Sequence, residues 1–263
     1  MTEIPTTLDY VLRKDTDGIS ELTLNRPKKY NALSMEMLEA LLNHLNDIEK
    51  EEHIKVIVIG AAGKAFCPGH DLKEIRANRN KAFGDALFGK CTEMMLKIRS
   101  LKQIVIAKVQ GVATVAGCQL VATCDLAIAV DHARFATSGI NYGIYCSTPA
   151  VPLSRNIHPK KALEMLMTGD FLSAKEAKEE GLINKVVPAD ELEEAVLKMA
   201  TTIAKKGKDA QQIGKSMFYE QLNMDLESAY AYASDKIVCS ILSPDGEEGL
   251  NAFVEKRKPN FKR

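Results

Sequence analysis

Two glycine-bearing segments of this sequence could bind an anion through backbone N–H groups. The first reads GKAFCPGHDLK from Gly63 to Lys73, and the second reads GVATVAGCQ from Gly111 to Gln119. Each follows an apolar run, and a loop that leads from a strand into a helix presents unbonded N–H groups beside the positive end of the helix dipole. Two such loops that converge can stabilise the charge that develops on a carbonyl oxygen, as an enolate or tetrahedral intermediate requires.

The glycines alone do not establish such a site. Glycine after a strand also marks an ordinary tight turn, and neither segment matches the P-loop or the dinucleotide-binding pattern. The five histidines show neither H-E-x-x-H spacing nor a pairing with cysteines, so we predict no metal site. An oxyanion site therefore depends on how the chain positions the two segments.

Strand and helix patterns alternate through about residue 140. Asp17 and Gly18 separate two short apolar runs, which indicates a hairpin. Ser34 can cap a helix whose leucines between residues 38 and 45 recur at the three-and-four spacing of one buried face. Apolar runs typical of strands covered on both faces span residues 54–59, 104–109 and 126–130. This alternation predicts an α/β fold with parallel strands joined by crossover connections.

The later part of the chain is more helical. Ser173 and Glu176 match the capping box of a helix start, and Gly181 can end that helix. Residues 183–187 are predicted to form a short strand, and nearly all residues after Asp190 are predicted to be helical. We therefore expect a core over residues 1–190 and a helical C-terminal region over residues 191–263, which does not form an independent domain.

Composition excludes several classes of protein. The chain has 263 residues, 46% of them hydrophobic, and its 35 Lys and Arg balance 35 Asp and Glu, so no global positive field favours nucleic acid or an anionic membrane. Six cysteines without a C-x-x-C pair indicate a reducing compartment. No apolar stretch reaches the roughly 20 residues of a membrane span. The first residues lack a signal core, so we expect a cytoplasmic protein, or a mitochondrial one if a transit peptide has been removed.

Six motifs, in order and spread over nearly the whole chain, resemble the crotonase (enoyl-CoA hydratase/isomerase) superfamily. They are LNRPxxxNAL at 24–33, AFCxGxDLK at 65–73, AGC at 116–118, CD at 124–125, TG at 168–169 and AFVEKRKPNF at 252–261. The resemblance implies a crotonase-type spiral of strand–strand–helix turns, with a helical C-terminal region that mediates trimers, often paired into hexamers. It also implies a coenzyme A thioester as substrate and no prosthetic group.

The resemblance also implies roles for individual residues. The oxyanion hole would be the backbone N–H groups of His70 and Ala116, with Gly117 opening the helix behind it. Phe253 and Lys256 would reach coenzyme A from a neighbouring subunit, and the basic tail that includes Arg257, Lys258, Lys262 and Arg263 would oppose its phosphates. The alternative for the lysines named in this paragraph is that they are solvated surface charges, as most lysines in loops are. The path of the adenine and pantetheine would pass Lys28, Tyr30, Ala32, Lys64, Gly69, Asp71, Leu72 and Lys73.

The sequence departs from the superfamily at both glutamates that carry out hydration. The first position is Gln119, whose amide can hold a water molecule but cannot take its proton near neutral pH. The second lines up with Gly139. Losing one general acid or base typically costs about 100-fold to 10,000-fold, so isomerisation, decarboxylation or thioester hydrolysis is favoured over efficient hydration. The alternatives are a non-catalytic acyl-CoA binder or assembly partner and a weak enoyl-CoA hydratase.

Other side chains near these positions have two interpretations. The His70 imidazole either turns toward the acyl group or faces solvent or its own turn. Tyr142, with Tyr145, Cys146 and Ser147, either lines the acyl pocket or only packs. Asp71 and Asp125 are expected to cap or close loops rather than act as acids.

Overall fold

The computed structural model describes residues 9–261, and its first elements are the predicted hairpin and helix. Strands β1 (Val11–Thr16) and β2 (Ile19–Leu24) pair antiparallel. Asp17 and Gly18 join them with φ values of 50° and 78°, the left-handed conformation that such a turn needs. Ser34 caps helix α1 (Met35–Glu49) by accepting the N–H of Met37, and the predicted leucine face is buried.

Within residues 9–261, ten strands form two sheets. The larger sheet has the order β1-β2-β3-β5-β7-β10, and all its neighbours are parallel except the hairpin. Its remaining strands are β3 (Val56–Ala61), β5 (Ile104–Val109), β7 (Leu126–Val130) and β10 (Lys185–Val187). The smaller sheet has the order β4-β6-β8-β9, with strands β4 (Ala65–Cys67), β6 (Val112–Thr114), β8 (Arg134–Ala136) and β9 (Leu172–Ser173).

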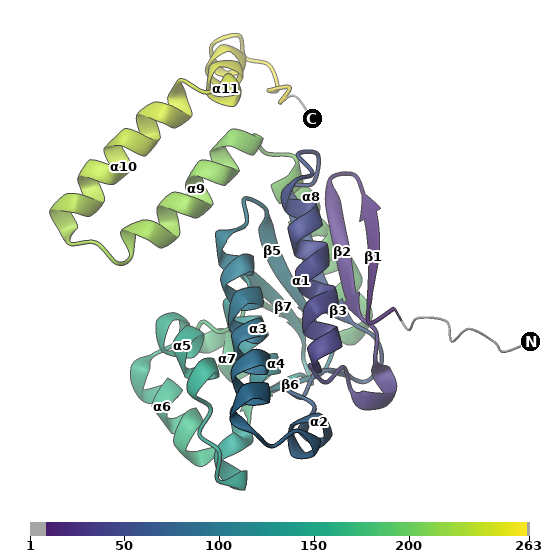
Figure 1. Ribbon diagram of the computed structural model, residues 1–263. Helices are drawn as coiled ribbons and strands as arrows, with labels where there is room; N and C mark the ends of the chain where they lie inside the picture. Colours follow the sequence, from purple (N-terminus) through teal and green to yellow (C-terminus); the bar gives the residue numbers. More distant parts are fainter. Residues whose placement is uncertain (1–8, 262–263) are drawn as a thin grey trace, which may run out of the picture.

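The chain alternates between these sheets and then returns through a helix. Each odd strand β3, β5 and β7 joins the larger sheet, and β4, β6 and β8 that follow them join the smaller one. The helices that follow each pair are α2 (Leu72–Ala77) and α3 (Lys81–Ser100), then α4 (Ala116–Thr123), then α5 (Ser147–Asn156) after the 3-10 turn η2 (Ser138–Tyr142). This repeat is the predicted spiral, and α1 and α3 cover the face of the larger sheet opposite α8 (Figure 1).

The helix after β9 begins at the predicted capping box. Ser173 and Glu176 bond reciprocally at the start of α7 (Ala174–Glu179), and Gly181 follows it with φ 88°. The predicted strand over residues 183–187 begins two residues later, because the N–H of Ile183 turns back to the carbonyl of Ala177. The other core elements are η1 (Pro27–Lys29), α6 (Pro159–Thr168), η3 (Ala189–Glu191) and α8 (Leu192–Ala204).

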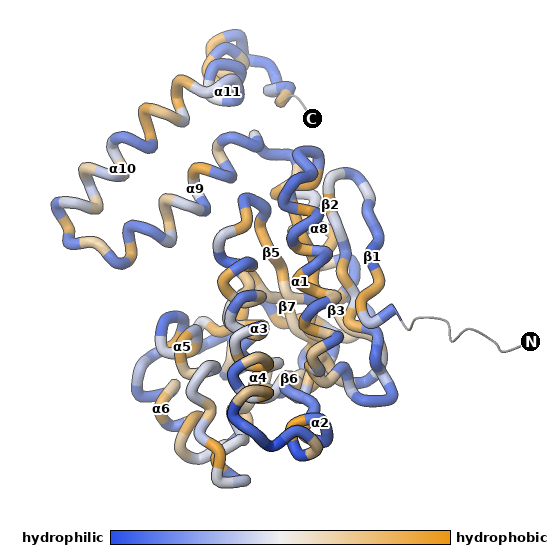
Figure 2. Tube along the Cα trace, viewed as in Figure 1, coloured by the Kyte–Doolittle hydropathy of each residue, from blue (hydrophilic) through white to orange (hydrophobic). Residues whose placement is uncertain are grey.

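Three helices at the C-terminus project from the core, and we call them the C-terminal arm. They are α9 (Lys208–Gln221), α10 (Leu226–Ile241) and α11 (Pro244–Val254) (Figure 1). Helix α10 buries none of its residues, yet apolar positions run along it (Figure 2). The arm leaves large apolar side chains exposed at Phe218, Leu222, Leu226, Tyr230, Ile237, Val238, Ile241, Leu242, Leu250, Phe253 and Val254.

A buried ion pair holds the arm against the core. Lys215 of α9 places its ammonium 2.6 Å from the carboxylate of Asp125, and these side chains are only 2% and 7% exposed. The same ammonium donates to the carbonyls of Ile98 and Gln103, and the hydroxyl of Tyr219 donates to Asp125 at 2.7 Å. Burial lowers the pKa of Lys215. Asp125 thus has the predicted structural role.

Candidate active site

The two glycine-bearing segments lie against each other because the strands before them are neighbours. Strand β4 pairs in parallel with β6, so both segments leave the smaller sheet at the same end. The hydroxyl of Thr114 donates to the carbonyl of Pro68 at 3.0 Å. At Gly69, where φ is 103°, a Cβ would lie 3.0 Å from that of Val115 and 3.2 Å from the nitrogen of Ala116. The two segments therefore pack against each other where they leave the smaller sheet.

Glycine is also required where the second segment becomes helix α4. A Cβ at Gly117 would lie 2.1 Å from the carbonyl oxygen of Cys67, so only glycine allows this close approach. Val115, just before the helix, has φ 52° and ψ −117°, a conformation that strains a β-branched residue. Such strain typically costs about 1–3 kcal/mol and is found at functional sites.

Two N–H groups at this junction are unbonded. Leu33 donates to the carbonyl of Gly69 at 2.8 Å and accepts from the N–H of Asp71 at 3.3 Å, so the N–H of His70 between them takes no part in the pairing. It donates to no group in residues 9–261, and the same holds for the N–H of Ala116, the first residue of α4. Two free donors beside a helix N-terminus are what oxyanion stabilisation requires.

The imidazole of His70 is buried, with 9% of the residue exposed. Its Nδ1 lies 3.2 Å from the carbonyl oxygen of Leu33, which can only accept, so Nδ1 carries the proton. Nε2 is then an acceptor, and it has no partner within the described chain. The ring packs edge-on against Phe88 at 5.1 Å. Burial lowers the pKa of His70. The alternative that this ring faces solvent or its own turn is wrong.

Gln119 lies one helical turn after Ala116 and is also buried, with 4% of the residue exposed. Its side-chain oxygen is unbonded within residues 9–261, although its backbone carbonyl accepts from the hydroxyl of Thr123. A buried side-chain oxygen without a partner is unusual, since buried polar groups are nearly always hydrogen-bonded. The position where a hydratase would have its first glutamate therefore still carries a polar group.

Gly139 has no room for a side chain. A Cβ there would lie 2.7 Å from the sulfur of Cys146 and 2.7 Å from the carbonyl oxygen of Ile144. The turn is closed by the N–H of Ile144, which donates to the carbonyl of Gly139 at 3.0 Å. Cys146 is buried, which raises the pKa of its thiol. Tyr142 and Tyr145 are 75% and 42% exposed, so their role in an acyl pocket stays a prediction.

The residues of the predicted adenine and pantetheine path belong to the loop of residues 27–32 and to the first glycine-bearing segment. The amide of Asn31 donates to the carbonyls of Ala62 and Ala65, which ties the loop of residues 27–32 to the first glycine-bearing segment. Asp71 caps α2 and lies 3.5 Å from Arg26, as a structural residue should. Two residues of the predicted path, Ala32 and Gly69, are buried. Those that are exposed are Lys28, Tyr30, Lys64, Leu72 and Lys73.

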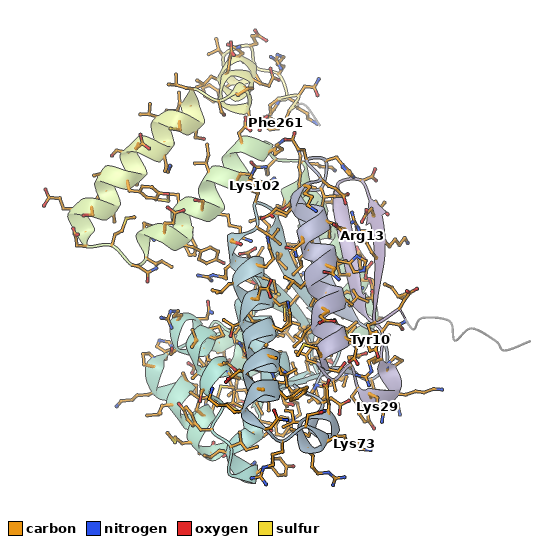
Figure 3. All side chains as sticks on the ribbon, in the orientation of Figure 1. Tyr10, Arg13, Lys29, Lys73, Lys102 and Phe261 are labelled. Atoms are coloured by element: carbon orange, nitrogen blue, oxygen red, sulfur yellow. The ribbon has the colours of Figure 1, made fainter. Side chains whose placement is uncertain are left out.

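Phe253 lies on the C-terminal arm, and Lys256 follows the last helix of the arm, α11, by two residues. Figure 3 shows Lys73 at the opposite end of the molecule from Phe261. Phe253 is 84% exposed. Phe253 and Lys256 therefore lie far from the glycine-bearing segments of their own chain. That they contact coenzyme A bound to a neighbouring subunit stays a prediction. Arg257 already pairs with Glu248 at 2.6 Å, so it is not available as a free counter-charge, and Lys262 and Arg263 lie outside the described residues.

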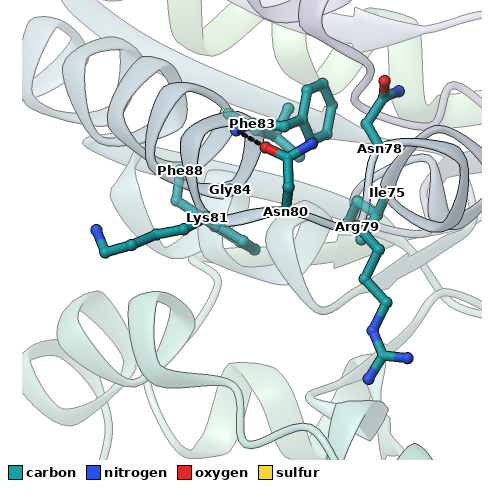
Figure 4. Close-up of a pocket in the computed structure, with 9 residues that line it drawn as sticks. Ile75, Asn78, Arg79, Asn80, Lys81, Phe83, Gly84 and Phe88 are labelled. Atoms are coloured by element: carbon teal, nitrogen blue, oxygen red, sulfur yellow. Dashed lines mark hydrogen bonds between the residues drawn. The ribbon is translucent and has the colours of Figure 1, made fainter.

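A cavity of about 280 Å³ adjoins the site between α2 and α3 (Figure 4). Phe83, Leu87 and Phe88 give it an apolar wall, and Phe88 also touches the ring of His70. Sequence reasoning missed this cavity. The four-residue spacing of Phe83 and Leu87 signals one helix face but not what lies opposite it.

Residues 9–261 contain neither a cluster of metal-binding side chains nor a membrane-spanning helix. Within that range, no group of three His, Cys, Asp or Glu side chains is placed to hold a metal ion. No helix there is both long and apolar enough to cross a membrane.

Comparison with known proteins places these features in a family. Residues 14 to 263 match the family model described as enoyl-CoA hydratase/isomerase. The rat protein named enoyl-CoA hydratase domain-containing protein 3, mitochondrial, is 45% identical over 246 residues, which cover 94% of this chain and 82% of the relative. The human protein of the same name is 44% identical, with 94% and 81% covered.

Solved structures agree with the sequence comparison. The crystal structure of an enoyl-CoA hydratase from Mycobacterium smegmatis has a TM-score of 0.94 and 48% identity, and the match covers 96% of this chain and 98% of that one. That of human enoyl coenzyme A hydratase domain-containing protein 3 has a TM-score of 0.94 and 43% identity, with 96% and 100% covered. The chain therefore belongs to the enoyl-CoA hydratase/isomerase family.

Proposed function

We propose that this protein binds an acyl-CoA and stabilises the enolate or oxyanion of its thioester between the N–H groups of His70 and Ala116. The observation that carries the proposal is that neither N–H group has a partner within residues 9–261, and that the two lie on segments packed together, one of them at a helix N-terminus. The substrate class follows from the family, and no prosthetic group is needed for this chemistry.

The reaction we propose is isomerisation, decarboxylation or thioester hydrolysis rather than efficient hydration. Gln119 and Gly139 replace the two carboxylates that hydration uses, and neither can serve as a general base. Decarboxylation relies on the enolate hole more than on a base, because carbon dioxide leaves without proton transfer. The buried Nε2 of His70, which has no partner within residues 9–261, belongs to the same residue as one N–H of the proposed hole.

The test is turnover of a panel of thioesters by the purified protein, followed by mass spectrometry of the products. Crotonyl-, 3-enoyl-, butyryl- and methylmalonyl-CoA separate hydration, isomerisation, hydrolysis and decarboxylation. We expect a product from at least one of the last three reactions. Hydration of crotonyl-CoA at ordinary hydratase rates would contradict our interpretation of Gln119 and Gly139.

A non-catalytic acyl-CoA binder is the second candidate, and the closed packing around Gly139 favours it. The turn leaves no space for a carboxylate, so the loss of acid–base chemistry is part of the local fold. Calorimetric titration with acetyl-, butyryl- and methylmalonyl-CoA separates the two candidates when combined with product analysis. Binding of a thioester with no product from any member of the panel supports the second candidate.

We also propose that the protein assembles as a homotrimer, or as a hexamer of two trimers, through the C-terminal arm. The exposed apolar side chains of the arm support this, since a patch of that kind is normally covered in an assembly. Phe253 and Lys256 would then reach coenzyme A bound to a neighbour. Light scattering gives the mass, and a Phe253→Ser variant should weaken both assembly and acyl-CoA affinity.

For localisation we propose the cytoplasm, which the described cysteines support. All six are free, and five are buried as thiols. The curated relatives named above are mitochondrial, so a processed organellar form is the alternative. Mass spectrometry of the N-terminal peptide from fractionated cells distinguishes a full-length cytoplasmic chain from a cleaved one.

A further inference from the structure

The turn of residues 61–65, between β3 and β4, is held by the side-chain amide of Gln110. Nε2 of that amide donates to three carbonyls of the turn, which are those of Ala61 at 2.7 Å, Gly63 at 3.2 Å and Ala65 at 3.0 Å. Asn31 shares the carbonyl of Ala65, to which its Nδ2 donates at 3.0 Å. Asn31 belongs to the loop of residues 27–32, and Gln110 directly precedes the second glycine-bearing segment. The turn therefore connects that loop to both glycine-bearing segments.

The backbone packs closely on both sides of this turn. A Cβ at Gly111 would lie 2.3 Å from the carbonyl oxygen of Lys64. A Cβ at Gly63 would lie 2.8 Å from the Cβ of Pro27. These contacts fix where the turn lies, and the amide of Gln110 fixes the direction in which its carbonyls point.

The amide of Gln110 acts only as a donor. All three neighbours of Nε2 are carbonyl oxygens, which can only accept, so the amide nitrogen must face them. Its Oε1 is buried and has no partner within residues 9–261. The side chain thus keeps an orientation that satisfies the turn and leaves its own oxygen unbonded.

Because its carbonyls face protein amides, the turn keeps its donors available to a ligand. The backbone N–H groups of Gly63 and Lys64 donate to no group in residues 9–261, and Lys64 is exposed. Successive free N–H groups in a turn form a concavity that suits an anion, and the lysine adds a positive charge. Coenzyme A carries phosphates, and Lys64 is one of the residues of the predicted path.

We propose that Gln110 is a positioning residue for the coenzyme A part of the substrate and acts through the turn of residues 61–65. Its hydrogen bonds keep the N–H groups of Gly63 and Lys64 available to that part of the ligand, whereas the thioester carbonyl binds at His70 and Ala116. The proposal rests on the proposed function, because it requires that an acyl-CoA binds at this site. It gives a role to a residue that lies outside the six motifs of the resemblance.

The test compares two thioesters of the same acyl group, butyryl-CoA and butyryl-N-acetylcysteamine, which lacks the nucleotide and most of the pantetheine. Ligand-observed NMR titration measures the Kd of each. Gln110→Met has nearly the length of glutamine but no donor. We expect this variant to bind butyryl-CoA roughly 10-fold more weakly, as the loss of one or two neutral hydrogen bonds implies. Its Kd for the truncated thioester should not change.

Gln103→Met is the matched control. Gln103 precedes the opposite end of β5, is 4% exposed, and donates through Nε2 to the carbonyl of Ile48 at 3.0 Å. Its loss should leave both Kd values unchanged, although it also removes a buried amide. Gln110→Asn keeps the amide but is one methylene shorter, so it should show a smaller loss for butyryl-CoA alone. This milder variant serves as the test if a thermal melt shows that Gln110→Met does not fold.

The outcomes separate this inference from the proposed function. A folded Gln110 variant that keeps the wild-type ratio of the two Kd values overturns the inference, and the proposed function stands. An equal loss of affinity for both thioesters also overturns it, because the residue would then support the whole site rather than the coenzyme A part. If the wild-type protein binds neither thioester, the proposed function fails.

Discussion

A Cβ atom at Gly139 would lie 2.7 Å from the sulfur of Cys146. The sulfur occupies the space that the first atom of a side chain needs, and the carbonyl of Ile144 blocks it at the same distance. Restoring a glutamate here therefore requires the turn to open. The packing around residue 139 therefore excludes a carboxylate side chain at the position where the sequence carries glycine.

Replacing Gly139 by alanine should destabilise the protein by about 1–3 kcal/mol, as overpacking of a closed site does. Gly139→Glu should cost more and should not create hydratase activity, even together with Gln119→Glu. Urea denaturation followed by circular dichroism measures the free energy of unfolding. Gly89→Ala is the matched control, because a Cβ there meets nothing within 4 Å at an exposed position of α3 and should stabilise by about 0.5–1 kcal/mol. Equal effects at both glycines would refute the packing argument.

Stability should depend on pH through His70. Burial lowers its pKa below the ordinary 6.5, so below that pH the unfolded chain binds a proton that the folded chain does not. The contribution of His70 to the free energy of unfolding is fully present above pH 6.5. It is lost as the pH falls toward the pKa that His70 has in the folded protein. Urea denaturation at pH 7.5 and pH 5.5 should show a smaller loss for His70→Asn than for the wild type. The other four histidines are common to both proteins and cancel in this comparison.

Removing Lys215 should be severely destabilising. Lys215→Met leaves the carboxylate of Asp125 buried without its counter-ion, which typically costs about 3–5 kcal/mol. Asp125→Asn in the same chain should recover part of the loss, since the two residues act as a unit. The exposed pair of Lys81 and Asp85 is the control, and Lys81→Met should change the free energy of unfolding by less than about 1 kcal/mol. Equal losses from the two lysine variants would argue against the importance of the buried ion pair of Lys215 and Asp125.

Proline at Ala116 should remove one donor of the proposed oxyanion hole. Ala116 is the first residue of α4, where proline is generally tolerated, and Pro159 and Pro244 hold this place in α6 and α11. We expect Ala116→Pro to reduce turnover of the active thioester by about 100-fold to 1,000-fold. A thermal melt checks that the variant folds. Unchanged turnover in a folded variant would exclude this N–H from the reaction.

Local signals in the sequence predicted most of the fold. Asp17 and Gly18 marked the hairpin, Ser34 and Ser173 marked helix starts, and the motifs of the resemblance indicated the family that the comparisons show. The start of β10 was wrong by two residues, because the N–H of Ile183 bonds to α7 and a strand pattern does not encode that bond.

Features that join distant parts of the chain were beyond sequence reasoning. Nothing local indicates that Lys215 meets Asp125, that Cys146 fills the space at Gly139, or that Phe88 covers His70. Single residues of ordinary type carry these contacts, and only the tertiary fold brings them together. The predicted roles of His70 and Ala116 came from the resemblance, and the structure adds that neither N–H group has a partner in the described part of the chain, residues 9–261.

The ion pair of Asp125 and Lys215 also sets an order in time. The two residues are 90 apart, so a ribosome that adds about 5–20 residues per second makes the lysine roughly 5–18 seconds after the aspartate. Throughout that interval, the carboxylate of Asp125 lacks both its counter-ion and the hydroxyl of Tyr219. Synthesis of α9 therefore supplies the last partners of a residue at the start of a central strand, and a chain released before it should remain a target for chaperones and proteases.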